Sequence, residues 1–348
     1  YEHLRHRDDN PCVVLPTGCH AAGHPILMFD GTVKPVEDIR VGDKLMGPDS
    51  QPRLVRRLCR GEDEMFRVVP NRGEAFVVNG DHVLSLMSTN EGKRWESTQK
   101  GGEITNISVR DYLTKTRSWK HLRKLYRVPI DFQSSACLPL PAYILGLLIG
   151  DGHIVDTVEL TTVDEQTADA WDEYVQSIGS RNVVRDHDNR CPTYRMITGR
   201  GKYNIVTEVL ENLGLAGCRS FSKFIPHIYL TANRNDRLQL LAGLIDSDGC
   251  RHRSGFEITT ASRELAADIV FLCRSLGYSA NCASKYSCCQ TGADGWYFRI
   301  YIDGNCHEVP CRLPRKQAGR RAQKKDPLRT GFKIEACGRG QYLSLIHI

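Results

Sequence analysis

The sequence predicts a multidomain protein in which an all-β unit is interrupted by an α+β unit. Three observations lead to this prediction. The 348 residues exceed what one domain of about 150 residues holds. Short alternating apolar runs fill residues 24–90, whereas helical periodicity begins near residue 138. Strand patterns return after residue 326, as expected when one domain is inserted into another.

The first unit is predicted from short runs in which apolar and polar residues alternate, as in half-buried strands. Turn pairs such as Asp30-Gly31 and Gly80-Asp81 separate these runs. An earlier apolar run at 13–15 ends in a Pro-Thr-Gly turn and is read as a short strand. The other predicted strands cover residues 25–29, 44–46, 64–69, 75–78, 82–86 and 331–335.

The second unit is predicted from apolar residues that recur at helical spacing, with strand-like runs between them. The expected helices cover residues 141–150, 165–178, 203–213, 237–245 and 262–276. The expected strands cover residues 158–162, 194–197, 257–260 and 296–302.

Composition places the chain among ordinary globular proteins, with 41% hydrophobic and 25% charged residues. No apolar run approaches the roughly 18 residues that span a bilayer, so no membrane partner is expected. The first ten residues are rich in His, Arg and Asp, which excludes a secretory signal there. Fourteen cysteines without CxxC spacing indicate a reduced protein, and we expect a cytoplasmic location.

The net charge of +6 is concentrated in one segment, residues 311–325, which holds seven basic residues and no acidic one. Two interpretations remain open for this segment. It is either a solvated charged loop or a surface that contacts DNA phosphates. The candidate DNA-binding residues are Arg312, Arg315, Lys316, Arg320, Arg321, Lys324 and Lys325.

An internal repeat relates residues 144–152 to residues 241–249. Each copy is an apolar helix that ends in Asp-Gly. Small residues such as Gly146 and Gly243 remove side chains that would keep two helices apart, so the helices are expected to pack closely. Asp151 and Asp248 end the two copies, where a helix C-terminus is already negative. Gly152 and Gly249 suit the left-handed position after a helix. Two carboxylates brought together there predict a divalent cation.

This repeat resembles the motif of the LAGLIDADG (DOD-type) homing endonucleases, written here as ILGLLIGDG and LAGLIDSDG. The resemblance implies a single-chain pseudo-dimer, expected to be a monomer, that grips a long double-stranded DNA site with β-ribbons. It also implies that Asp151 and Asp248 hold Mg²⁺. Lys223, in a Lys-Phe-Ile-Pro sequence, is either a catalytic residue that stabilises charge or activates water near the phosphate, or an exposed lysine at a strand start. Lys316 is a weaker candidate for its symmetry mate and is expected to contact the DNA backbone.

The first unit resembles the opening block of inteins, which fold as an all-β, horseshoe-like Hint domain. The segment 19–46 begins with Cys19 and continues through Asp-Gly-Thr and Val-Gly-Asp. The resemblance implies that Cys19 attacks the carbonyl of Gly18 and that His82 protonates the departing amide nitrogen. Asn79 stands where the family usually has threonine and is expected to orient that amide. No cofactor is expected for splicing.

Residues 13–18 resemble the start of a superfamily 2 (DEAD/DEAH-type) helicase P-loop, so helicase exteins are the expected partners in cis. The DNA target is then the intein-free helicase allele. The expected domains are an N-extein at 1–18, the first Hint part at 19–135 and the endonuclease at 136–312. A basic linker with a partial second Hint part follows at 313–342. The last six residues do not continue the Hint pattern, and we expect a truncated splicing domain with an artefactual tail at 343–348.

The alternative function is a LAGLIDADG-type DNA-binding regulator without cleavage activity. That alternative predicts loss of one motif carboxylate, but both Asp151 and Asp248 are present. A helicase activity of this chain is excluded because the P-loop lysine is missing. A self-processing domain without a nuclease would lack the repeat.

Overall fold

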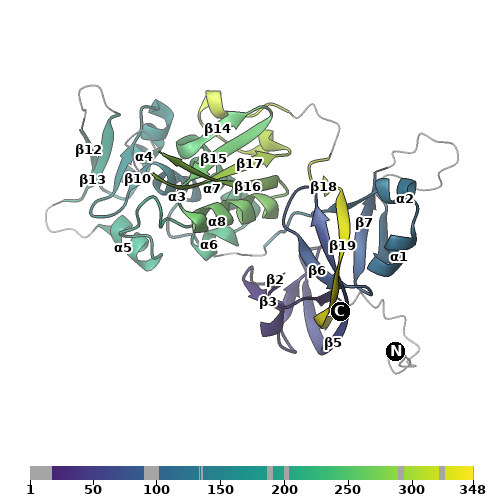
Figure 1. The fold of residues 1–348 in the computed structure, drawn as a ribbon. Helices are drawn as coiled ribbons and strands as arrows, with labels where there is room; N and C mark the ends of the chain where they lie inside the picture. The colour runs from purple at the N-terminus through teal and green to yellow at the C-terminus, as the bar shows by residue number, and fades with distance from the viewer. Residues whose placement is uncertain are drawn as a thin grey trace. The chain divides into compact units, whose positions relative to one another are not determined.

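The computed structural model describes residues 18–89, 102–132, 134, 136–185, 191–199, 204–288, 294–320 and 326–347. The chain forms two compact units. Within the described residues, one unit comprises 18–47, 51–126 and 330–347, and the other comprises 48–50 and 127–329 (Figure 1). The insertion is therefore confirmed. Its boundaries differ from the expected 136 and 312, because the backbone of Ile130 hydrogen-bonds to Ser275 and Arg237 of the second unit, and residues 313–320 pack within that unit.

The first unit is built from three sheets. The largest has the strand order β19-β1-β6-β5-β4, the second has the order β18-β9-β7-β8, and β2 pairs with β3. The predicted strands at 25–29, 44–46, 64–69, 75–78, 82–86 and 331–335 are present, although most have shifted ends, and the predicted strand at 13–15 lies outside the described residues. The strands are β1 (Gly18–His20), β2 (Pro25–Leu27), β3 (Val33–Pro35), β4 (Lys44–Met46), β5 (Pro52–Pro70), β6 (Phe76–Asn79), β7 (Val83–Ser88), β8 (Ile104–Ser108), β9 (Arg123–Tyr126), β18 (Arg329–Thr330) and β19 (Phe332–His347).

Strand β19 differs most from the sequence prediction. It runs antiparallel to β5 along nearly its whole length, with a register shift between Ala336 and Gly338. Its last residues also pair with β1, where Leu345 lies opposite Gly18 and Ser344 lies opposite Cys19. Leu345 is buried in a cluster with Met28 and other apolar residues. Residues 343–347 are therefore placed as part of the main sheet rather than as a tail outside it.

The first unit is built mainly of β-strands, as expected, and also contains short helices that the sequence did not predict. Two short helices, α1 (Val109–Thr114) and α2 (Arg117–His121), follow β8. Each begins at a hydroxyl residue whose side chain accepts a backbone N–H of the first turn, at Ser108 and Thr116 respectively. Tyr112 of α1 is buried against the sheet core.

The second unit repeats one α-β-β-α-β-β pattern. The first half contains α3 (Ala142–Gly150), β10 (Gly152–His153), β11 (Glu159–Thr161), α4 (Glu165–Ser177), β12 (Arg181–Arg185) and β13 (Thr193–Ile197). The second contains α7 (Arg234–Asp248), β14 (Gly249–His252), β15 (Gly255–Thr260), α8 (Arg263–Ser275), β16 (Ser279–Cys288) and β17 (Asp294–Asp303). Between the halves lie α5 (Ile205–Asn212) and α6 (His227–Leu230).

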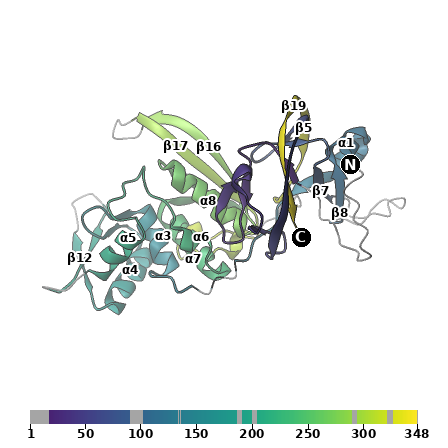
Figure 2. The same cartoon turned by 90° about the horizontal axis from the view of Figure 1, so that it is seen from below.

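Each half forms one four-stranded antiparallel sheet. Their orders are β10-β11-β13-β12 and β14-β15-β17-β16, which are the same order at equivalent strands. In the second half, β16 and β17 form a long hairpin beside α8 (Figure 2). The fully buried residues Trp171 of α4 and Ile269 of α8 lie in one continuous core with α3 and α7. The internal repeat of the sequence is thus a structural repeat.

Helices α3 and α7 pack against each other at the centre of this core. A Cβ atom added to Gly243 would lie 2.2 Å from the carbonyl oxygen of Tyr143, and one added to Gly146 would lie 2.5 Å from that of Leu240. Real side chains do not tolerate such distances, so both positions require glycine. The predicted close approach of the two repeat helices is confirmed. No helix in the described part of the chain is long and apolar enough to cross a membrane.

Candidate active sites

The two repeat helices end side by side and place both motif carboxylates in one region. Asp151 caps the C-terminus of α3, and Asp248 is the last residue of α7. A Cβ atom on Gly150 would lie 2.0 Å from Oγ of Ser247, so the helices are still in contact at these last turns. The sequence therefore located the carboxylates correctly.

The glycines after the two aspartates have a different role from the one predicted. Gly249 has φ −83° and ψ 157°, which is extended backbone, and Gly152 begins a strand. Neither is left-handed. A Cβ atom on Gly152 would lie 2.4 Å from the carbonyl oxygen of Leu148, and one on Gly249 would lie 2.6 Å from Cα of Ile245. Each glycine lets the departing strand fold back tightly over the last helical turn.

The two carboxylates are electrostatically linked. Their side chains keep a solvent-exposed face but are otherwise surrounded by protein. This burial and the charge of Asp248 raise the pKa of Asp151 to about 6. Burial also raises the pKa of Asp248. Two neighbouring carboxylates with raised proton affinity are poised to bind a cation.

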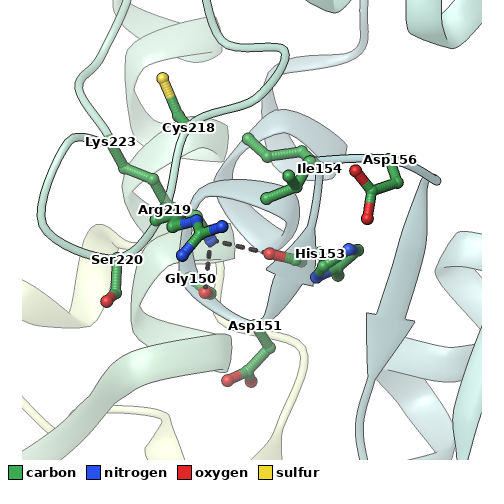
Figure 3. Close-up of a pocket in the computed structure, with 11 residues that line it drawn as sticks. Gly150, Asp151, His153, Ile154, Asp156, Cys218, Arg219, Ser220 and Lys223 are labelled. Carbon is green, nitrogen blue, oxygen red and sulfur yellow. Dashed lines mark hydrogen bonds between the residues drawn. The ribbon is translucent and has the colours of Figure 1, made fainter.

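Lys223 lies at the C-terminus of α3 and is buried, so the exposed-lysine interpretation is wrong. Its Nζ donates to the carbonyl oxygens of Leu148, Gly150 and Gly152 at 3.1, 3.0 and 2.8 Å. Figure 3 draws the bonds to Gly150 and Gly152. An ammonium group has three N–H donors, and all three are used here. Burial lowers the pKa of Lys223, while the charge of Asp248 raises it.

Lys316 occupies the equivalent position at the end of α7. Its Nζ donates to the carbonyl oxygens of Ile245, Asp246 and Ser247 at 2.9, 2.8 and 2.8 Å. The side chain is buried, so the expected contact with the DNA backbone is corrected. Lys316 is instead the symmetry mate of Lys223, which was the weaker of the two interpretations of the sequence.

The other candidate DNA-binding residues of the basic segment 311–325 differ in their surroundings. Arg312 stacks 4.1 Å over the ring of Tyr143, and its backbone N–H donates to Oδ2 of Asp246 at 2.6 Å. Arg315 pairs with Asp164. Arg320 is exposed and remains a candidate for DNA contact. The candidates Arg321, Lys324 and Lys325 lie outside the described residues.

An open pocket of about 450 Å³ borders Asp151 and Lys223 (Figure 3). Its lining combines the strand after α3 with the loop that carries Lys223, and includes the polar residues His153, Arg219 and Ser220. A carboxylate, a fixed cation and a further guanidinium beside open space provide a place for a phosphate.

In the first unit, the Gly18–Cys19 bond and His82 are brought together as predicted. The backbone N–H of Cys19 donates to Nδ1 of His82 at 3.2 Å. Burial and the charge of His24 lower the pKa of His82 to about 4, so this imidazole is neutral near pH 7 and its Nδ1 can accept. Cys19 is buried, which raises the pKa of its thiol, and a hydrogen bond with the Ser344 side chain opposes that rise.

Asn79 lies at the end of β6 and is buried. Its Nδ2 donates to Oδ2 of Asp63 at 3.1 Å, and its Oδ1 has no hydrogen-bond partner among the described residues. Asp63 in turn accepts from Arg110 at 2.8 Å. No described contact joins Asn79 to the Cys19 amide, so its expected role in orienting that amide remains a prediction.

Sequence reasoning missed two histidines at this site. The ring of His20 stacks on His24 with centroids 4.0 Å apart and meets the His82 ring edge-on at 4.8 Å. Burial and the two neighbouring imidazoles lower the pKa of His20 to about 2. The available signal was the clustering of His20 and His24 directly after the nucleophile.

The second unit carries a carboxylate at the end of each of its two repeat helices, and it is inserted into a β unit that contains a Cys–His junction. Together these features define a nuclease-bearing self-processing protein. Residues 19–135 match the family described as Hom_end-associated Hint, and residues 224–308 match the family described as Homing endonuclease. The chain therefore combines a Hint domain with an inserted homing endonuclease, which is the architecture of an endonuclease-bearing intein.

Several curated proteins are similar to parts of this chain. The catalytic subunit of the V-type proton ATPase of Candida tropicalis is 37% identical over 126 residues, covering 33% of this chain and 11% of the relative. The replicative DNA helicase DnaB of Mycobacterium intracellulare is 26% identical over 272 residues, covering 71% of this chain and 41% of the relative. The chain thus spans less than half the length of either relative.

A solved structure of the homing endonuclease I-DmoI in complex with DNA and Mn is similar to 47% of this chain and 89% of its own chain. Its TM-score is 0.34 and its sequence identity is 14%.

Proposed function

We propose that the inserted unit cleaves double-stranded DNA with the help of Mg²⁺, and that the Hint unit converts the Gly18–Cys19 peptide bond into a thioester. One observation carries the nuclease proposal. Asp151 and Asp248 lie at the ends of two helices in contact, and each helix end is held by a buried lysine.

The two carboxylates fit a divalent cation. Mg²⁺ binds proteins through one or two carboxylates and completes its shell with water and substrate phosphates. Asp151 and Asp248 supply such a pair, and a cation would remove the repulsion from Asp248 that, after burial, contributes to the raised pKa of Asp151. When bound, Mg²⁺ would stabilise charge on the scissile phosphate and favour ionisation of the attacking water.

The two lysines act as fixed positive charges rather than proton carriers. Each ammonium group has its three protons bound to backbone carbonyls, so neither can accept a proton from water. The charge of Lys316 opposes the rise in the pKa of Asp151 most strongly, and that of Lys223 does so for Asp248. Lys223 and Lys316 thereby keep both carboxylates ionised and offset charge that develops at the phosphate.

Cleavage of a plasmid tests the nuclease proposal. The proposed substrate is the intein-free helicase allele, cut around the codons for Pro16, Thr17 and Gly18 and the Gly-Lys-Thr expected beyond. We expect linear product with Mg²⁺, none with EDTA and none from Asp248→Asn. Equal cutting of interrupted and uninterrupted alleles would contradict a homing role. DNA binding without cleavage in any divalent cation would favour the regulator alternative.

The acyl shift at Gly18–Cys19 moves one proton overall from sulfur to nitrogen. The Cys19 sulfur forms a bond to the Gly18 carbonyl carbon, and the bond from that carbon to the Cys19 nitrogen breaks. Nδ1 of His82 is unprotonated in the resting site, so it would first take up the thiol proton and then pass it to the departing amine nitrogen, which it already contacts. The buried thiol has a raised pKa and needs this assistance.

Thiol-induced release tests this step. Dithiothreitol should intercept the thioester and free the segment 1–18, as read by mass spectrometry. Cys19→Ala should abolish the release and Asp151→Asn should leave it unchanged. Release that persists in Cys19→Ala would indicate ordinary proteolysis and overturn the proposal.

The proposal also covers the host protein, the oligomeric state and the cellular compartment of the chain. Similarity to proteins as different as a proton pump and a replicative helicase supports a module carried inside larger proteins. We propose a helicase as the host, with its exteins as partners in cis. A single chain already supplies both nuclease halves, so a monomer is proposed. The cysteines of the sequence lack CxxC spacing, which supports a reducing compartment such as the cytoplasm.

A further inference from the structure

The segments that carry Lys223 and Lys316 are each fastened to the opposite half of the endonuclease unit. Lys223 lies between the halves, after α5, and binds the carbonyls of α3, which belongs to the first half. Lys316 follows the second half and binds the carbonyls of α7. The residues that hold these two segments in place come from the first half of α8 and from the start of α4.

The Lys223 segment is held by α8 of the second half. Oγ of Ser262, the residue before α8, donates to the carbonyl oxygen of Lys223 at 2.7 Å. Further along α8, Oδ2 of Asp268 accepts from the backbone N–H of Ile225 at 2.8 Å. Ser262 is buried, so this attachment is shielded from water.

The Lys316 segment is held by α4 of the first half. Asp164, the residue before α4, occupies the place that Ser262 occupies before α8. Its two carboxylate oxygens accept from NH1 and NH2 of Arg315 at 3.0 and 2.7 Å. A bidentate pair of this kind fixes direction as well as distance. Arg315 is adjacent to Lys316, so the pair sets the position of the lysine.

We infer that Asp164 and Arg315 position Lys316, and that Ser262 and Asp268 position Lys223, as two cross-braces between the halves. The inference rests on the proposed nuclease function. Each half must be folded before the motif helix of the other half can bind the ammonium group of its lysine. A double-strand cut needs two strand cuts, and the cross-braces couple the positions of the two lysines that would support them.

The two braces differ in strength. The Asp164–Arg315 pair is partly solvent-exposed, with side-chain exposures of 22% and 55%, whereas Ser262 is buried. Loss of the exposed pair should therefore leave the fold intact and loosen only Lys316. The nuclease should then cut one strand well and the other slowly. A displacement near 1 Å at such a group costs up to roughly a hundredfold in rate.

The first experiment measures the position of Lys316 without requiring cleavage. The full chain is treated with an amine-acylating reagent, and modification of each lysine is followed by mass spectrometry. In Asp164→Asn and in Arg315→Gln we expect Lys316 to be acylated roughly tenfold faster than in the parent, with Lys223 unchanged. Glu308→Gln, which breaks the similarly exposed Arg234–Glu308 pair, is the matched control and should change neither. Unchanged protection of Lys316 in both variants would overturn the inference.

The second experiment measures strand coupling on supercoiled plasmid that carries the target. Asp164→Asn and Arg315→Gln should accumulate nicked circles, whereas the parent and Glu308→Gln should proceed to linear DNA. The charge-swapped pair Asp164→Arg with Arg315→Asp should restore linear product. An equal fall of nicking and linearisation would overturn the positioning role. Failure of the parent to cut any DNA would instead contradict the proposed function, and the acylation result would still decide the inference.

Discussion

Replacement of Gly243 by alanine should separate the two helices that carry the motif carboxylates. The added Cβ would lie 2.2 Å from the carbonyl oxygen of Tyr143, 3.0 Å from Cα of Gly146 and 3.1 Å from the backbone nitrogen of Leu147. All three atoms belong to the backbone of α3, so no side chain can rotate away. Relief requires α3 and α7 to move apart by about 1 Å, given contact distances near 3.5 Å.

The expected change in the free energy of unfolding is the balance of two opposing effects. Alanine in place of glycine favours a helix interior by about 1 kcal/mol. Overpacking of a close-packed core costs about 1–3 kcal/mol and more when backbones collide. We expect a net loss of about 2 kcal/mol, which for a unit of this size lowers its Tm by about 4–8 °C. Cleavage should fall by up to roughly a hundredfold, because the carboxylates are displaced with their helices.

Scanning calorimetry and plasmid cleavage measure the two effects on one preparation. Gly295→Ala is the control, since a Cβ at that position meets nothing within 4 Å. It should leave both Tm and cleavage unchanged. If Gly243→Ala melts at or above the parent temperature and cuts at the parent rate, then helix propensity outweighs the predicted clash. The close packing of α3 on α7 would then not be what places the carboxylates.

Three further predictions follow from the two sites. Mg²⁺ should raise the Tm of the endonuclease unit and Asp248→Asn should remove that rise, as thermal denaturation with MgCl₂ or EDTA would reveal; an equal rise in the variant would place the cation elsewhere. Lys223→Met should lose far more activity than Lys223→Arg, because three carbonyls lose their donor; equal activity of the two variants would rule out a need for the fixed charge. Burial lowers the pKa of His82 from about 6.5 to about 4, so the neutral His82 side chain contributes to stability above about pH 6.5. This contribution is lost as the pH falls through about 4. The ¹⁵N shift of Cys19 should therefore change near pH 4, and a midpoint near 6.5 would show an unperturbed imidazole.

The sequence predicted the features that depend on local pattern. The helices at 141–150, 165–178 and 262–276 were placed within one or two residues, because their apolar spacing is strong and continuous. The paired carboxylates were found because the motif occurs twice. The small residues between the helices had a direct steric meaning that the structure bears out.

The features that the sequence did not predict depend on contacts with residues far away in the chain. Nothing local to Lys316 distinguishes a lysine that caps α7 from one that faces solvent. The role of Gly152 was missed because the collision that excludes a side chain there involves the preceding helical turn, not a left-handed backbone. The pairing of residues 343–347 with β1 joins segments more than 300 residues apart, which no pattern in either segment reveals.

The place of β19 in the main sheet also has a consequence for the order of events during synthesis. Strand β1 carries the Cys19 nucleophile and lies between β6 and β19. On the ribosome, β6 emerges early, whereas β19 emerges only after the roughly 200 residues of the endonuclease unit. At about 5–20 residues per second that delay is about 10–40 s. During this interval the nascent chain holds a nucleophile whose sheet is open on one side, while the nuclease halves can already fold. Closure of the sheet beside Cys19 can therefore follow only after the nuclease unit has been made, and the acyl shift that we propose would be delayed until then.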